Sequence, residues 1–175
     1  MTGIGPAIAA RARELGADLV GFVPSHQLAE SPSRDTEAAR SGSSRLDTGH
    51  SRNSGHSPYD LAGGWSAVVI VVSHPASRPE MDWFTSSGNT PGNAKLIGIT
   101  RELATWLEDA EHRSTIPLHY YVEKGGIYLK DAAVHAGLGC VGVNNLLVTP
   151  EFGPRVRLRA LMVNTRLEGT GPIDF

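Results

Sequence analysis

A glycine-rich segment is the part of this sequence most suggestive of ligand chemistry. Residues 137–142 read Gly-Leu-Gly-Cys-Val-Gly and fit the pattern G-x-G-x-x-G. In a dinucleotide-binding site that pattern follows a strand and opens a helix, but here residues 129–136 have a helical pattern and residues 144–148 resemble a strand. The order of helix and strand around these glycines is therefore the reverse of the order in a dinucleotide-binding site. The segment instead favours a tight turn that lets a large flat ligand approach the backbone, because glycine has no side chain to hold it away.

Other side chains have the chemistry of a binding site, each with a structural alternative. Cys140 is the one cysteine of the chain, and its apolar neighbours predict burial rather than a thiolate ligand or nucleophile. The arginines among residues 155–159 suit a carboxylate or phosphate, although a solvated edge of a sheet is the favoured interpretation. His50 and His56 lie in a polar segment without further ligands, so no metal site is predicted. Aromatic side chains that could stack on a ligand or pack in the core are Trp83, Tyr120, Tyr121 and Tyr128.

Helices and strands of ordinary length must position these residues. The predicted helices are residues 4–15, a segment that begins at Thr90, and residues 127–136. The predicted strands are residues 18–23, 66–73, 116–123, 145–149 and 156–164. The helix after Thr90 carries an apolar stripe of Leu96, Ile99, Leu103, Trp106 and Leu107. Because helices and strands mix without regular βαβ repetition, the sequence predicts an α+β sandwich.

One segment does not fit this pattern. Ser31–Pro58 is rich in Ser, Arg and Gly and has few apolar residues. Such a composition cannot bury enough apolar surface to offset the entropy of ordering the chain. We therefore expect a mobile loop at residues 31–58 within a single domain formed by residues 1–175.

Composition excludes several classes of protein. The 175 residues include 16 Lys and Arg against 18 Asp and Glu, for a formal charge of -2, so binding to nucleic acid by charge alone is not expected. The longest apolar run, residues 67–72, is far too short for a membrane span, and the N-terminus lacks the pattern of a signal peptide. A cytoplasmic protein without membrane contact is predicted. A single cysteine excludes an iron–sulfur cluster held by this chain alone.

A longer segment carries a more specific signal. Residues 129–147, LKDAAVHAGLGCVGVNNLL, and residues 149–159, TPEFGPRVRLR, resemble the central motif of the epoxyqueuosine reductase family. That family is related to reductive dehalogenases and to cobalamin-processing proteins with a nitroreductase-like fold. Residues 12–22, ARELGADLVGF, resemble its opening. The resemblance implies a nitroreductase-like α/β sandwich with a mainly antiparallel sheet.

The resemblance also implies a cofactor and a reaction. Family members hold a corrinoid (cobalamin) with its lower base detached and reduce its cobalt with electrons from [4Fe–4S] clusters, and the low-valent metal then reduces a substrate. The corrinoid would contact Lys130, Ala133, Gly137, Leu138, Gly139, Cys140, Gly142 and Asn144. Epoxide-reducing members have an acidic proton donor upstream of the glycines, and the matching residue here is Glu123. A carboxyl group there is a general acid if burial raises its pKa, and the alternative is an exposed Glu123 paired with Lys124 or Lys130.

The chain departs from the family at three places. Val143 stands where epoxyqueuosine reductases have a lysine, and Glu123 replaces an aspartate, which argues against queuosine chemistry itself. The family continues into a ferredoxin-like segment with eight cysteines, whereas this sequence stops at residues 171–175. We therefore expect either a truncated chain or a separate electron donor. The expected partners are that donor and a small-molecule or modified-nucleoside substrate. The alternatives are a non-enzymatic corrinoid carrier or chaperone and a flavin-dependent, nitroreductase-like enzyme.

Overall fold

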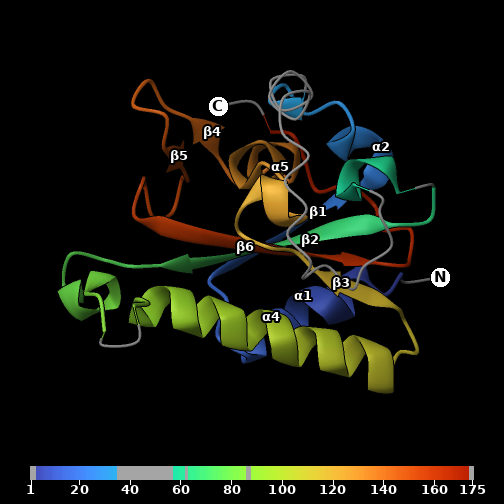
Figure 1. Cartoon of the computed structure of the whole chain (residues 1–175), viewed down its shortest axis with the longest axis horizontal. Coiled ribbons are helices and arrows are strands. Elements are labelled where there is room, and N and C mark those ends of the chain that lie inside the picture. The colour runs from blue at the N-terminus through green and yellow to red at the C-terminus, as the bar shows by residue number, and fades with distance from the viewer. Residues whose placement is uncertain (1–2, 35–56, 62, 86–87, 174–175) are drawn as a thin grey trace.

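A four-stranded antiparallel sheet lies at the centre of the fold, with helices on both of its faces (Figure 1). The computed structural model describes residues 3–34, 57–61, 63–85 and 88–173, and of Glu123 it describes the backbone alone. The strands stand in the order β1-β2-β6-β3. Their bounds are Leu19–Pro24 for β1, Ser66–Ser73 for β2, Thr115–Pro117 for β3 and Val156–Val163 for β6. The predicted α+β class with a mainly antiparallel sheet is confirmed.

The helices form a layer on each face of the sheet. α1 (Gly5–Glu14) and α4 (Pro91–Asp109) cover one face, and α2 (Ser25–Leu28) and α5 (Leu129–His135) cover the other. A hairpin of β4 (Cys140–Val141) and β5 (Leu147–Val148) stands beside α5. The short 3-10 helices are η1 (Pro58–Asp60), η2 (Pro79–Asp82) and η3 (Val122–Lys124). None of the described helices is both long and apolar enough to cross a membrane.

The sequence of β2 explains its place in the middle of the sheet. It pairs with β1 on one side and with β6 on the other, and residues 67–72 are all buried. Successive side chains of a strand point to opposite faces. Val68 and Ile70 accordingly join the core shared with α1 and α4, whereas Val69 and Val71 join the core shared with α5. The predicted strand at residues 66–73, buried on both faces, is confirmed with the same bounds.

α4 packs on the sheet through the predicted apolar stripe. The helix begins after Thr90, whose Oγ1 accepts a hydrogen bond from the N–H of Asn93 at 3.3 Å, and Pro91 occupies its first turn. The buried members of the stripe are Leu96, Ile99, Leu103 and Leu107, and Trp106 packs beside them. Each buried leucine contributes about 1.5–3 kcal/mol. The stripe therefore fixes α4 against the sheet and sets its first turn beside β6.

The strand predicted at residues 116–123 is shorter than expected. β3 ends at Pro117. Proline suits an edge strand because the outer side of such a strand has no neighbouring strand to which an N–H group would donate. The chain then turns away into η3, where the N–H of Lys124 donates to the carbonyl of Tyr121 at 3.1 Å. The prediction is therefore wrong beyond Pro117. The strand predicted at residues 145–149 is likewise reduced to β5.

The segment predicted to be a mobile loop, Ser31–Pro58, falls mostly outside the described residues. Residues 35–56 lie there, including His50 and His56. The mobility of the segment and the assignment of one domain stay predictions. Its described start is packed against the protein, because Ser31 is buried.

Candidate functional site

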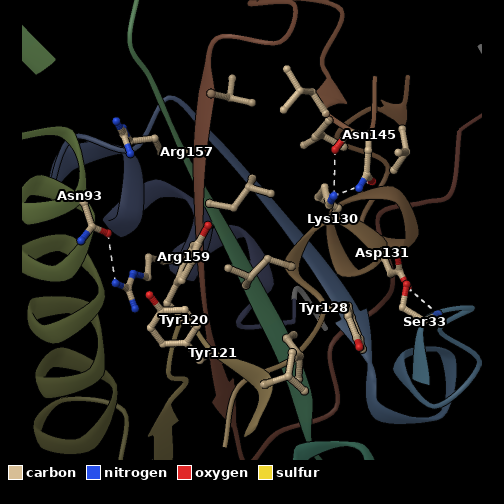
Figure 2. Close-up of a pocket in the computed structure, with 18 of the residues that line it drawn as sticks. Ser33, Asn93, Tyr120, Tyr121, Tyr128, Lys130, Asp131, Asn145, Arg157 and Arg159 are labelled. Carbon is tan, nitrogen blue, oxygen red and sulfur yellow. Dashed lines mark hydrogen bonds between the residues drawn. The ribbon is translucent and has the colours of Figure 1, made fainter. Parts of the chain in front are cut away.

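A large cavity opens beside the sheet at the point where β3 ends (Figure 2). Its volume is about 1370 Å³, above the range of roughly 300–1,000 Å³ that is usual for small-molecule sites. The N-terminal half of β6 runs along the cavity between the first turn of α4 and the helix α5 with its hairpin. Aromatic and apolar side chains of the lining include Phe84, Tyr120, Tyr121, Tyr128, Val156 and Leu158. The size and the lining suit a large ligand with apolar faces.

One wall of the cavity is a free strand edge. The N–H of Leu118 donates to the carbonyl of Ala160 at 3.1 Å, and there the chain leaves β6. Hydrogen-bonding directions alternate along a strand. Leu158, two residues before Ala160, therefore directs its N–H and C=O to the same side, where β3 no longer covers β6. The cavity thus offers a ligand backbone donors and acceptors as well as side chains.

Two charged residues of α5 fix the opposite wall. Lys130 Nζ donates to the backbone carbonyl and to Oδ1 of Asn145, at 2.8 and 2.6 Å, which holds the hairpin against α5 (Figure 2). Asp131 accepts hydrogen bonds from Oγ of Ser31 at 2.5 Å and from the N–H of Ser33 at 2.9 Å. The wall is therefore held in place by polar contacts between segments far apart in the sequence.

The carboxylate of Asp82, at the end of η2, contacts three basic side chains near the first turn of α4. Asp82 accepts a hydrogen bond from Arg157 at 2.6 Å, contacts Nδ1 of His74 at 2.9 Å and lies 3.7 Å from Arg155. Burial raises the pKa of the Asp82 carboxyl, but the hydrogen bond from Arg157 and the charge and hydrogen bond of His74 outweigh it, so that the pKa is lowered. The ionised carboxylate holds Arg157 and His74 in the cavity lining.

Arg159 lies on the same face of β6 as Arg157, two residues further along the strand. Its Nη2 donates to Oδ1 of Asn93 at 3.1 Å, and its guanidinium lies 5.6 Å from the centre of the Tyr120 ring. Figure 2 shows these three side chains together on the α4 side of the cavity, across from Lys130. Burial lowers the pKa of the Arg159 guanidinium, and Tyr120 acts in the opposite direction.

The glycine-rich segment packs mainly against its own chain. Gly137 has a φ of 69°, and a Cβ there would lie 2.8 Å from the carbonyl oxygen of Thr170. A Cβ on Gly139 would overlap the carbonyl oxygen of Val148 in the hairpin. Both glycines therefore allow close contact between backbone segments.

The predicted cofactor-binding residues divide into two sets. Lys130 and Cys140 line the cavity. The lining does not include Ala133, Gly137, Leu138, Gly139, Gly142 and Asn144, of which Ala133 and Leu138 are buried in the core shared with α5. The cofactor-binding role of all eight residues stays a prediction.

Glu123, the predicted proton donor, lies in η3. Its neighbour Val122 lines the cavity. The side chain of Glu123 is outside the described part of the chain, so its catalytic role and its alternative pairing with Lys124 or Lys130 both stay predictions.

Two expectations about individual residues are wrong. Cys140 is exposed rather than buried, because it lies in a hairpin that stands beside α5 instead of in the sheet. The expectation of a solvated face is wrong for two of the arginines, because α4 and Asp82 pack against that face of β6. Arg157 and Arg159 are partly buried between β6 and α4, while Arg155 is exposed.

Sequence reasoning missed three residues of the cavity region. The helical pattern places Asn93 only at the start of a helix, and its part in the cavity depends on how the first turn of α4 lies beside β6. His74 and Asp82 have no local pattern, because their pairing depends on how the chain returns after β2. Among the described residues, no group of three or more His, Cys, Asp or Glu side chains is arranged to hold a metal ion.

Comparison with known proteins finds likeness at the level of structure. No family model matches the sequence, and no curated protein matches it. Solved structures do match. An epoxyqueuosine reductase in complex with an epoxyqueuosine-modified tRNA-Tyr stem loop superposes with a TM-score of 0.68 and 20% identity, over 98% of this chain and 48% of that one. The epoxyqueuosine reductase from Streptococcus thermophilus gives 0.66 and 21%, over 98% and 49%.

A second group of enzymes has the same fold. A catabolic reductive dehalogenase matches with a TM-score of 0.64 and 19% identity, over 97% of this chain and 22% of that one. A further reductive dehalogenase structure, described with a mechanism for B12-dependent dehalogenation, matches with the same values. The chain therefore shares the fold of domains of epoxyqueuosine reductases and reductive dehalogenases, and the resemblance seen in the sequence is confirmed as a shared fold. The chain spans about half the length of the epoxyqueuosine reductases and about a fifth of the length of the reductive dehalogenase.

Proposed function

We propose that this chain is the corrinoid-binding, nitroreductase-like domain of a reductase similar to epoxyqueuosine reductases. The observation that carries the proposal is the cavity of about 1370 Å³ beside the free edge of β6. It occurs in a fold shared with an enzyme of B12-dependent dehalogenation. A bound corrinoid would supply a low-valent cobalt centre that can reduce a substrate.

The described residues of the cavity fit such a group. A corrinoid is a broad, flat macrocycle with amide groups around its rim. Tyr120, Tyr121 and Tyr128 provide aromatic surface for its faces. The free N–H and C=O of Leu158 on β6 can both donate to and accept from amides. The Lys130–Asn145 contact keeps the hairpin wall at a fixed position.

The protein would also supply a proton, and we assign that role to Glu123. Its backbone position in η3, directly after the cavity-lining Val122, supports this assignment. A general acid at that place would protonate a substrate reduced in the cavity.

The alternative of a corrinoid carrier is favoured by a different observation. Cys140 is the one cysteine of the sequence, so this chain cannot supply the thiolates of a [4Fe–4S] cluster by itself. An enzyme would need an electron donor from elsewhere, whereas a carrier would not.

An absorption titration with cobalamin tests the proposal. We expect a saturable spectral shift that marks loss of the lower base of cobalamin. We also expect saturable binding of cobinamide, which has no lower base to lose. Absence of binding to both corrinoids would contradict the proposal. A yellow flavin retained by the purified protein would instead support the nitroreductase-like alternative. If corrinoid binds, reduction of the bound cobalt by a chemical reductant followed by turnover of an epoxide or aryl halide separates the enzyme from the carrier.

A further inference from the structure

Arg159 differs from the other arginines of β6 in its lack of an acidic partner among the described residues. Arg157 has Asp82 at 2.6 Å, and Arg155 has the same carboxylate at 3.7 Å. The interactions of Arg159 are with the neutral side chains of Asn93 and Tyr120. Its Nε is buried and has no hydrogen-bond partner in the described structure.

This arrangement of Arg159 is energetically unfavourable unless a negatively charged group binds to its guanidinium. A guanidinium does not give up its proton at neutral pH, so the partial burial of Arg159 leaves a charge that no acidic side chain of the described structure compensates. The lowered pKa of Arg159 has that cause. The side chain lies in the lining of the large cavity, so a ligand there can reach it.

The neighbours of Arg159 hold its guanidinium in one orientation. Asn93 accepts from Arg159 through Oδ1, and its own Nδ2 donates to Oδ1 of Asn89 at 2.7 Å. Both ends of the Asn93 amide are therefore engaged, which fixes its direction. The Tyr120 ring lies beside the guanidinium as a cation–π partner. Beyond that bond to Asn93, the Nη groups of the fork have no hydrogen-bond partner among the described residues, so they can donate to a ligand.

The electrostatic surroundings also favour a negative group. The positive end of the 19-residue helix α4 lies next to Asn93. The described lining residues include three cations, Lys130, Arg157 and Arg159, and one carboxylate, Asp131. Arg157 is paired with Asp82, which lies outside the lining, so Lys130 and Arg159 are the lining cations without an ion-pair partner among the described residues. Asp131 is on the α5 side, where it accepts hydrogen bonds from Ser31 and Ser33.

We propose that Arg159, positioned by Asn93 and Tyr120, is an anion-binding residue that takes a carboxylate or phosphate group of the ligand in this cavity. A guanidinium fork binds either group through paired hydrogen bonds. The proposal specifies the ligand of the cavity and in that respect rests on the proposed function. The anion has two sources, the phosphate in the nucleotide tail of cobalamin or an acid group on the substrate.

Anion binding is measured first, without any corrinoid. The probes are inorganic phosphate and benzoate, added at constant ionic strength to the ¹⁵N-labelled full chain. The readouts are the NMR signal of the Arg159 Nε–H group and the backbone amide signals of Asn93 and Tyr120, which remain measurable in every variant. The Nε–H signal is assigned by its loss in Arg159→Gln. We expect a saturable shift with at least one probe. Arg159→Gln and Arg159→Lys should bind that probe at least tenfold more weakly, because one lacks the charge and the other the fork.

A matched control separates this site from general charge effects. Arg13 is exposed on α1, away from the cavity, and Arg13→Gln removes the same charge. It should bind the probe as the wild type does. Failure of both probes to shift the Arg159 signal would overturn the proposal, as would unchanged probe binding in Arg159→Gln.

The source of the anion follows from the affinities for two corrinoids. Cobinamide lacks the nucleotide phosphate that cobalamin carries. If Arg159 takes that phosphate, Arg159→Gln weakens cobalamin binding at least tenfold and leaves cobinamide binding unchanged. If it takes an acid group of the substrate, both corrinoids bind as before while the probe anion is lost. Wild-type protein that binds the anion but neither corrinoid would contradict the proposed function and leave the anion site standing.

Discussion

Replacing Gly139 by alanine tests whether the glycine-rich segment is needed for packing within the protein. The added Cβ would overlap the carbonyl oxygen of Val148. A backbone atom cannot rotate away as a flexible side chain can, so the hairpin must shift. Overpacking of this kind costs about 1–3 kcal/mol. Because the contact is with backbone, we expect a loss near the upper end, about 2–3 kcal/mol, or roughly 5–10 °C in Tm for a chain of this size.

Two other glycines provide controls. Gly98 lies in the middle of α4, and its Cβ would meet nothing within 4 Å, so Gly98→Ala should raise stability by about 0.5–1 kcal/mol. Gly142 belongs to the same motif as Gly139, but its Cβ would lie 3.1 Å from Oδ1 of Asn144, an atom at the end of a side chain that can adjust. Gly142→Ala should therefore be close to neutral.

The assay is urea and thermal unfolding of the full chain, followed by circular dichroism without added ligand. Wild-type stability of Gly139→Ala, with Gly98→Ala stabilised as expected, would refute the argument from backbone contact. A loss confined to corrinoid affinity would show that Gly139 serves the ligand instead, as the sequence first suggested.

The remaining predictions concern Asp82 and Glu123. Asp82→Asn should lower the free energy of unfolding at pH 7 by about 1–2 kcal/mol, because it loses charge-assisted contacts with Arg157 and His74. The folded-state pKa of Asp82 is lowered, so its contribution is present above the unfolded-state pKa of about 4 and is lost as the pH falls through the folded-state value. Urea unfolding at pH 7 and pH 3 should show the difference between variant and wild type shrinking at the lower pH, and a constant difference would contradict the assignment. Glu123→Gln should reduce turnover of an epoxide or aryl halide by about 100-fold or more while leaving the affinity for cobalamin unchanged. Full turnover in this variant would exclude Glu123 as the proton donor.

Elements defined by strong local patterns could be predicted from the sequence. The β-branched run of β2 has the same bounds in sequence and structure, because burial on both faces leaves a continuous apolar signal. α4 was marked by the cap at Thr90 and by its apolar stripe. In β6 the arginines alternate with Val156, Leu158, Ala160 and Met162, and this local pattern puts the two sets on opposite faces, as the structure has them.

The cavity could not be predicted, because it depends on where strands stop and which strands become neighbours. The apolar pattern of Ile116 and Leu118 continues past Pro117, but the turn at Tyr121 ends β3 early and opens the edge of β6. Whether an arginine on β6 is solvated or buried depends on the strand order, which no local pattern reveals. The roles of Arg159 and Asp82 therefore emerged only from the three-dimensional arrangement.

The uncovered half of β6 also bears on how the protein avoids aggregation. An unpaired strand edge is a template on which a second chain can add a strand. Along this edge Arg157 and Arg159 flank Leu158. Two copies that paired edge to edge here would bring guanidinium groups of like charge against one another, which disfavours the pairing. The arginines therefore protect the exposed backbone from other copies of the protein while leaving it open to a smaller molecule.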